Sequence, residues 1–105
     1  MSQNATPSPP SLLKARIKVP QHVVYRSFPS ETVVLNLQTG KYHGLNPTAG
    51  RLLEVLEHSD SVLDAAVVAA RDYDRPQAAI EQDMCDLCSS LLARDLIEVE
   101  GDGAV

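Results

Sequence analysis

The stretch Glu31–Pro47, ETVVLNLQTGKYHGLNP, constrains the fold of this chain more than any other part of it. It begins with β-branched and aliphatic residues, reverses at Gly40 and ends in an Asn-Pro pair. Glycine adopts positive φ readily and therefore suits a tight turn between two strands. Asparagine is a favoured helix N-cap, and proline fits the first helical position. The stretch therefore predicts two short strands, Glu31–Leu37 and Lys41–Leu45, followed directly by a helix.

A third strand is expected just before this stretch, over His22–Phe28, which is rich in β-branched and aromatic residues. Short connections place strands that follow each other in sequence side by side, so Lys41–Leu45 should be an edge strand. In the middle strand, a period of two predicts one covered face. That face is expected to carry Val33, Leu35 and Leu37.

Three helices should follow, from Asn46 to near His58, from Ser61 to about Tyr73, and over Pro76–Arg94. Each has apolar residues at helical spacing. The expected faces are Ala49, Leu52, Leu53 and Leu56 in the first helix, Val62, Ala66, Ala69 and Tyr73 in the second, and Ile80, Met84, Leu87 and Leu91 in the third. Ser61-Val62-Leu63-Asp64 has capping-box-like spacing at the start of the second helix, with Asp in place of the more usual Glu. Asp74 is the expected cap of the third helix, and Leu96–Glu100 alternates as a short terminal strand or wing would.

One flank of the third helix carries further apolar residues, Cys85, Cys88 and Leu92, with Glu81 among them. Two explanations are open. Another helix covers this flank, or the flank lines a groove beside the edge strand.

The expected fold class is α+β, a winged helix-turn-helix with a three-stranded antiparallel sheet followed by three helices. A disordered tail is expected over residues 1–11, since three prolines and almost no bulky apolar residue cannot offset the ordering entropy. An extended arm is expected over 12–21, the domain over 22–100 and a frayed end over 101–105.

Charge argues against nucleic acid as a partner. The chain of 105 residues has a net charge of −5, and from residue 23 onward it holds six basic and fourteen acidic residues. Such a body repels phosphate backbones and anionic lipid, and a neutral or basic partner suits it better. A winged-helix transcriptional regulator stays the alternative, although the helix that would enter the groove carries Glu81, Asp83 and Asp86. The longest apolar run, Ala65–Ala70, is far too short to span a membrane, so a cytoplasmic protein is expected.

The residues do not support catalysis. The chain has neither a nucleophile motif nor a phosphate-binding glycine loop, and its paired carboxylates fall on helix surfaces. Cys85 and Cys88 form at best half a zinc site, so we expect no metal and no cofactor, with packing as their main role and redox or metal chemistry still open.

A free edge strand can bind an extended peptide by strand addition, with pockets for alternate side chains. This is the hypothesis that the residues favour. The expected peptide-binding residues are Lys41, Tyr42, His43, Gly44, Leu45, Glu81, Cys85, Cys88 and Leu92.

The run V-V-L-N-L-x-T-G-K-Y-H-G-L-N-P, Val33 to Pro47, resembles the signature of the PqqD-like family, named for pyrroloquinoline quinone biosynthesis protein D. The resemblance extends over roughly Val23–Val99. Arg94-Asp95-Leu96-Ile97 resembles the family ending x-G-L-[IV], with Asp95 where glycine is common.

The resemblance implies a RiPP recognition element, a small non-catalytic domain that binds the leader of a ribosomally made precursor peptide. In that family the leader adds an antiparallel strand to the third strand and lies beside the third helix. By position these are Lys41–Leu45 and the Cys85–Leu92 flank. The implied partner is a leader peptidase, as in lasso peptide biosynthesis, or a radical SAM enzyme, with lasso peptides favoured by size and by the T-G-x-Y-x-x-L-N-P pattern. A homodimer through the unprotected edge also stays open.

Overall fold

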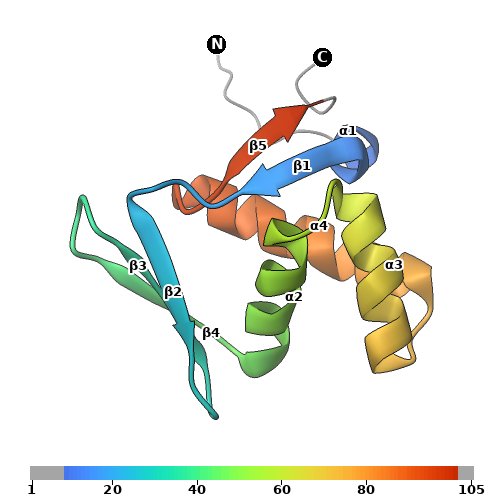
Figure 1. Ribbon diagram of the computed structural model, residues 1–105, viewed down its shortest axis with the longest axis horizontal. Coiled ribbons are helices and arrows are strands. Elements are labelled where there is room, and N and C mark those ends of the chain that lie inside the picture. The colour runs from blue at the N-terminus through green and yellow to red at the C-terminus, as the bar shows by residue number, and fades with distance from the viewer. Residues whose placement is uncertain (1–8, 102–105) are drawn as a thin grey trace.

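The computed structural model describes residues 9–101, so the expectations for 1–8 and 102–105 lie outside the described residues. The order of elements is a short helix, a strand, a three-stranded meander, three helices and a last strand (Figure 1). Their bounds are α1 Pro9–Lys14, β1 Ala15–Lys18, β2 Val23–Ser27, β3 Thr32–Asn36, β4 Tyr42–Leu45, α2 Pro47–Glu57, α3 Val62–Tyr73, α4 Gln77–Ala93 and β5 Glu98–Gly101. The predicted α+β fold, a three-stranded antiparallel sheet followed by three helices, is confirmed.

Two separate sheets are present in the described part of the chain. The meander has the order β2-β3-β4, and β1 pairs with β5 in an antiparallel ribbon of its own. Figure 1 shows the meander on one side of α2, with α3 on the other side and the β1-β5 ribbon across one end. The terminal strand predicted over Leu96–Glu100 therefore exists, and its partner is a strand near the start of the chain.

The expectation of a separate arm over 12–21 needs correction. Lys14 ends a helical turn, Ala15–Lys18 is a strand of the ribbon, and Leu12, Ala15 and Ile17 are buried in the common core. The domain consequently begins well before residue 22. The strand β1 was not predicted because apolar and basic residues are mixed there and its apolar side is only two residues long. Its partner β5 also lies about 80 residues further along the chain.

The phase predicted for the middle strand was wrong. Thr32, Val34 and Asn36 point into the core, whereas Val33 and Leu35 are half-buried and Leu37 is 56% exposed. The period of two was right, but β3 carries aliphatic residues on both faces. The polar side chains on the inner face have hydrogen-bond partners. Thr32 Oγ1 lies 3.1 Å from Ser27 Oγ, and Asn36 Oδ1 accepts a hydrogen bond from Gln38 N in the following turn.

The helix starts follow the predicted chemistry in two cases out of three. Asn46 Oδ1 accepts from Ala49 N at 2.8 Å with Pro47 in the first turn, and Ser61 Oγ accepts from Asp64 N at 3.0 Å. Asp74 was the exception. It ends α3 in the left-handed conformation at φ 51°, and Pro76 precedes α4 without a side-chain cap.

The core lies between the helices and the ribbon. Leu52, Leu53 and Leu56 of α2 meet the small residues of α3 and the apolar stripe of α4 there. Tyr73, predicted on the inner face of α3, is 36% exposed at its end. Leu87, predicted in the core stripe of α4, is only partly buried against the core.

Candidate peptide-binding site

The strand β4 is a free edge of the meander, as predicted. In antiparallel pairs, residues that exchange backbone hydrogen bonds alternate with residues that do not. Asn36 N donates to Lys41 O at 2.9 Å, and the same register pairs Val34 with His43 and Thr32 with Leu45. Lys41, His43 and Leu45 therefore direct their backbone groups toward β3. Tyr42 and Gly44 direct theirs toward the open edge.

The turn before β4 is held by one buried side chain. Asn36 Oδ1 accepts hydrogen bonds from Gln38 N at 2.9 Å and Thr39 N at 3.2 Å. Gly40 has φ 74°, the left-handed region that glycine enters without a steric cost. Lys41 N donates to Thr39 Oγ1 at 3.1 Å, so the backbone leading into the edge strand is fixed before any peptide arrives.

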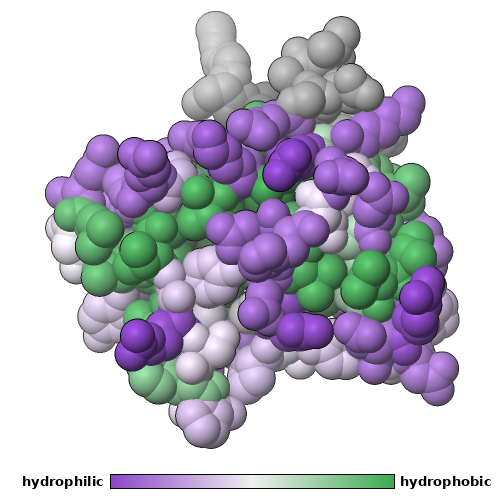
Figure 2. All heavy atoms as spheres, in the orientation of Figure 1, coloured by the Kyte–Doolittle hydropathy of each residue, from purple (hydrophilic) through white to green (hydrophobic). Residues whose placement is uncertain are grey.

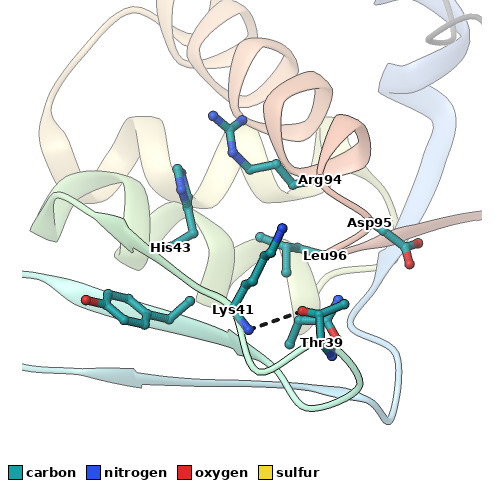
Figure 3. A pocket seen from close by; sticks show the side chains of 8 residues that line it. Thr39, Lys41, His43, Arg94, Asp95 and Leu96 are labelled. Atoms are coloured by element: carbon teal, nitrogen blue, oxygen red, sulfur yellow. Dashed lines mark hydrogen bonds between the residues drawn. The ribbon is translucent and has the colours of Figure 1, made fainter.

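A hollow of about 410 Å3 lies between β4 and the C-terminal end of α4 (Figure 3). We call it the edge groove. Its lining residues are Asn36, Thr39, Lys41, Tyr42, His43, Arg94, Asp95 and Leu96. Leu96 is buried and supplies an apolar patch, whereas the other side chains are mostly polar. The groove thus joins a free strand edge to a mixed surface that can distinguish side chains.

The end of α4 brings two charged residues to the groove. Arg94 Nη1 donates to Ser90 O at 3.2 Å and to Ser90 Oγ at 2.8 Å, which fixes the guanidinium beside the last turn. Asp95 has φ 59°, a left-handed conformation that reverses the chain toward Leu96. Its carboxylate lies 3.7 Å from Nε2 of His22.

The predicted site residues fall into two groups. Lys41, Tyr42 and His43 line the edge groove, and Gly44 is exposed on the same strand. The predicted residues from α4 do not line the edge groove. Leu45, the last residue of β4, does not line it either and is 7% exposed. Cys88 is fully buried, Cys85 is 6% exposed and Leu92 packs partly buried against the core. The second explanation for this flank, a groove-lining surface, is therefore not supported at the cysteines.

Glu81 also lies away from the edge groove, where its carboxylate accepts a hydrogen bond from Gln77 Nε2 at 2.9 Å. The residues that sequence reasoning missed are Asn36, Thr39, Arg94, Asp95 and Leu96. Two signals pointed to them: the turn residues before the edge strand, and the Arg94-Asp95-Leu96-Ile97 ending.

Both cysteines are free thiols in an apolar setting. Burial, with a smaller contribution from Cys85, raises the pKa of Cys88 to about 12. Burial also raises the pKa of Cys85, and Asp86 and Glu81 add to this. Both thiols are thus protonated and unreactive at neutral pH. Within residues 9–101, histidines, cysteines and carboxylates do not gather into any group of three or more that could hold a metal ion.

Comparison with known proteins agrees with this geometry. The family profile described as "Coenzyme PQQ synthesis protein D (PqqD)" matches residues 31–97, most of the described chain. The chain belongs to the PqqD family. Asp95, which aligns with the glycine of the family ending that Arg94-Asp95-Leu96-Ile97 resembles, has a positive φ that glycine adopts without steric cost.

Three solved structures share the fold. "TbiB1 in Complex with the TbiA(beta) Leader Peptide" is 28% identical, with TM-score 0.70, covering 81% of this chain and 99% of that one. "Lasso peptide synthetase B1 complexed with the leader peptide" is 23% identical, with TM-score 0.70, covering 80% and 99%. The PqqD truncation of Methylobacterium extorquens PqqCD, described as a stand-alone RiPP recognition element, is 23% identical, with TM-score 0.64, covering 78% and 87%.

No curated protein matches the chain. In the part of the chain that the structure describes, no helix has both the length and the apolar character needed to cross a membrane.

Proposed function

We propose that this protein is a non-catalytic recognition element for the leader segment of a ribosomally synthesised precursor peptide. The leader binds as an antiparallel strand on β4, and the protein presents the rest of the precursor to a separate processing enzyme. The observation that carries this proposal is the open edge at Tyr42 and Gly44 beside the edge groove. Membership of the PqqD family and 28% identity to TbiB1, which is described in complex with a leader peptide, support it.

Fluorescence polarisation tests this function directly. Fluorescein-labelled leader peptides of precursors encoded beside this gene are titrated with the purified protein. We expect saturable binding to at least one leader, and none to a scrambled peptide of the same composition. Absence of binding to every leader at tens of micromolar protein would overturn the proposal.

Hydrogen exchange tests the mode of binding, residue by residue. Leader binding should slow amide exchange at Tyr42 and Gly44, because their N–H groups gain acceptors. His43 and Leu45 serve as internal controls, since β3 already accepts from their N–H groups. Two leader peptides are then compared, one N-methylated at the odd positions and one at the even positions. Only the peptide whose methylated amides face β4 should lose binding. Equal protection of all four amides would argue for a peptide that covers the strand without pairing with it.

The partner enzyme is proposed to dock on the outer face of the meander. Register places Val24, Leu35 and Tyr42 in one row there, and Phe28 is 48% exposed nearby. Figure 2 shows apolar side chains gathered over the strands in this view. A leader strand on β4 would extend the same sheet, so an enzyme on this face would contact the protein and the leader together. Size and the T-G-x-Y-x-x-L-N-P pattern favour a lasso-type leader peptidase over a radical SAM enzyme as the first partner to test.

A substitution on this face separates docking from leader binding. Phe28→Ser should leave leader affinity within about twofold, because Phe28 does not line the edge groove, and should reduce leader cleavage by the peptidase encoded beside this gene. Val68→Ser is the matched control, an apolar residue on α3 that is 41% exposed. Unchanged cleavage with Phe28→Ser would place the enzyme elsewhere on the protein.

A further inference from the structure

The edge groove has a local charge opposite to that of the molecule. The chain as a whole carries −5. Three of the side chains that line the groove, Lys41, His43 and Arg94, bear basic groups, against the single carboxylate of Asp95. Figure 3 shows the three basic side chains directed into the space between β4 and the end of α4, whereas the carboxylate of Asp95 is turned away from them.

These cations are available to a ligand. Among the residues that the structure describes, neither Lys41 nor Arg94 forms an ion pair, whereas Lys18, Arg51 and Arg75 each do. Arg94 forms hydrogen bonds to the last turn of α4 through one nitrogen, Nη1, and its other N–H groups have no hydrogen-bond partner among the described residues. Asp95 is nearer to His22, with 3.7 Å between its carboxylate and Nε2. The groove therefore offers an ammonium and a guanidinium without a carboxylate between them.

Strand geometry says which side chains of a bound peptide meet these groups. If Tyr42 and Gly44 exchange hydrogen bonds with the peptide, the peptide residues that alternate with those bonded residues lie opposite Lys41, His43 and Leu45. Their side chains fall on the same face as those of the residues they oppose, and Lys41 and His43 face the groove. In an antiparallel strand, the residue opposite His43 comes two positions after the residue opposite Leu45.

We propose that the leader carries an aspartate or glutamate on its groove-facing side, opposite His43 or Lys41. Lys41 and Arg94 hold this carboxylate, and an apolar residue opposite Leu45 precedes it by two or four positions. This inference rests on the proposed function and names the chemistry of its ligand. It reverses the expectation drawn from total charge, which favours a neutral or basic partner, because a ligand in a groove responds first to the groups within a few ångströms.

A charge-exchange experiment tests the proposal. The probe is the fluorescein-labelled leader that binds the wild-type protein, together with versions in which each Asp or Glu is changed in turn to Asn or Gln. We expect one such change to weaken binding about fivefold, the upper range for an exposed ion pair. Arg94→Gln should weaken binding to a similar degree and Arg94→Glu more. A leader in which the same acidic residue is changed to Lys should bind the Arg94→Glu variant better than it binds the wild-type protein.

Controls keep the outcomes distinct. Arg71→Glu makes the same charge change on the surface of α3, outside the edge groove, and should alter binding less than twofold. Thermal melts of each variant establish that it is folded. A leader that binds but has no acidic residue, or one whose acidic residues can all be neutralised without loss, would overturn this inference and leave the recognition function standing. Failure of every leader to bind the wild type would overturn both.

Discussion

Cys88 shows at the residue scale how burial changes the chemistry of one side chain. Sequence spacing placed Cys85 and Cys88 on a flank of the third helix that either another helix or a ligand could cover. In the structure Cys88 is fully buried, and its pKa rises to about 12 because desolvation disfavours the thiolate. A buried protonated thiol packs as a small apolar group, so neither redox nor metal chemistry is indicated at this position.

This raised pKa predicts a loss of stability in alkali. The unfolded thiol ionises near its ordinary value of 9.0, whereas the folded thiol holds its proton to about pH 12. Between these values the folded state binds more protons than the unfolded state, so the free energy of unfolding falls as pH rises. We expect a loss of about 1 kcal/mol per pH unit above pH 9 from this group.

Urea denaturation between pH 8 and pH 11 measures this loss. Cys88→Ala is the comparison, because it removes the titrating group, and the slopes against pH are compared because the absolute stabilities also differ by packing. The variant should have the shallower slope. Tyr25, whose pKa burial and Glu57 also raise, contributes equally to both proteins. Parallel slopes would show that Cys88 is accessible to water in the folded state.

Packing between α2 and β3 decides the structure at the element scale. A Cβ atom on Gly50 would overlap Oγ1 and Cβ of Thr32, so the helix lies directly on the inner face of the strand. On the same inner face, Tyr25 Oη donates to Glu57 Oε1 at 2.5 Å and ties β2 to the end of α2. These contacts explain why Thr32 and Val34 face inward, although the aliphatic pattern alone favours Val33 and Leu35.

The close approach predicts a large effect of a small substitution. Gly50→Ala should destabilise the fold by about 2 kcal/mol or more, because overpacking outweighs the roughly 1 kcal/mol that alanine gains over glycine in a helix. Gly44→Ala is the matched control. There the added Cβ would meet only Glu31 Oε1 at 2.8 Å, the end of a flexible side chain.

Urea denaturation midpoints of both glycine variants measure these changes in stability. Gly44→Ala should change stability by less than about 1 kcal/mol, since its new neighbour can move. A stable Gly50→Ala protein would mean that α2 can shift away from β3 without loss, and the position of the edge strand would then be less firmly held than the contacts indicate.

The open edge of the meander is the feature that matters at the scale of the whole molecule. Tyr42 and Gly44 leave unpaired backbone groups on a short strand, and exposed strand edges tend to pair with other strands. The same groups are proposed to bind the leader. A second copy of the chain and the leader would therefore compete for one site.

Sedimentation velocity tests this competition. At high micromolar concentration the free protein should shift toward dimer, and a saturating leader peptide should return it to monomers in one-to-one complexes. The control is the N-methylated leader that no longer binds the protein, and it should leave the dimer intact. A protein that stays monomeric at every concentration would show that the short edge does not pair with itself.

Much of the fold could be read from local chemistry. The turn at Gly40, the caps at Asn46 and Ser61, and the edge position of Lys41–Leu45 all follow from neighbouring residues, and each is present. Long-range partners could not be read in this way. Pairing of β1 with β5 and the inward phase of β3 depend on which distant surface fills the space beside them.

The sequence by itself determined the order of the three meander strands and the three helices after them, the free edge and the family, because these depend on turns, caps and residues close together in the chain. Only the tertiary structure decided the edge groove. It brings Arg94 and Leu96 beside Lys41 and His43 across about 50 residues of intervening chain, and it buries the cysteines that spacing placed near the site. The physical reason is that periodicity defines which side of an element is apolar, whereas packing against distant elements decides which apolar side is covered and which groups are left to bind.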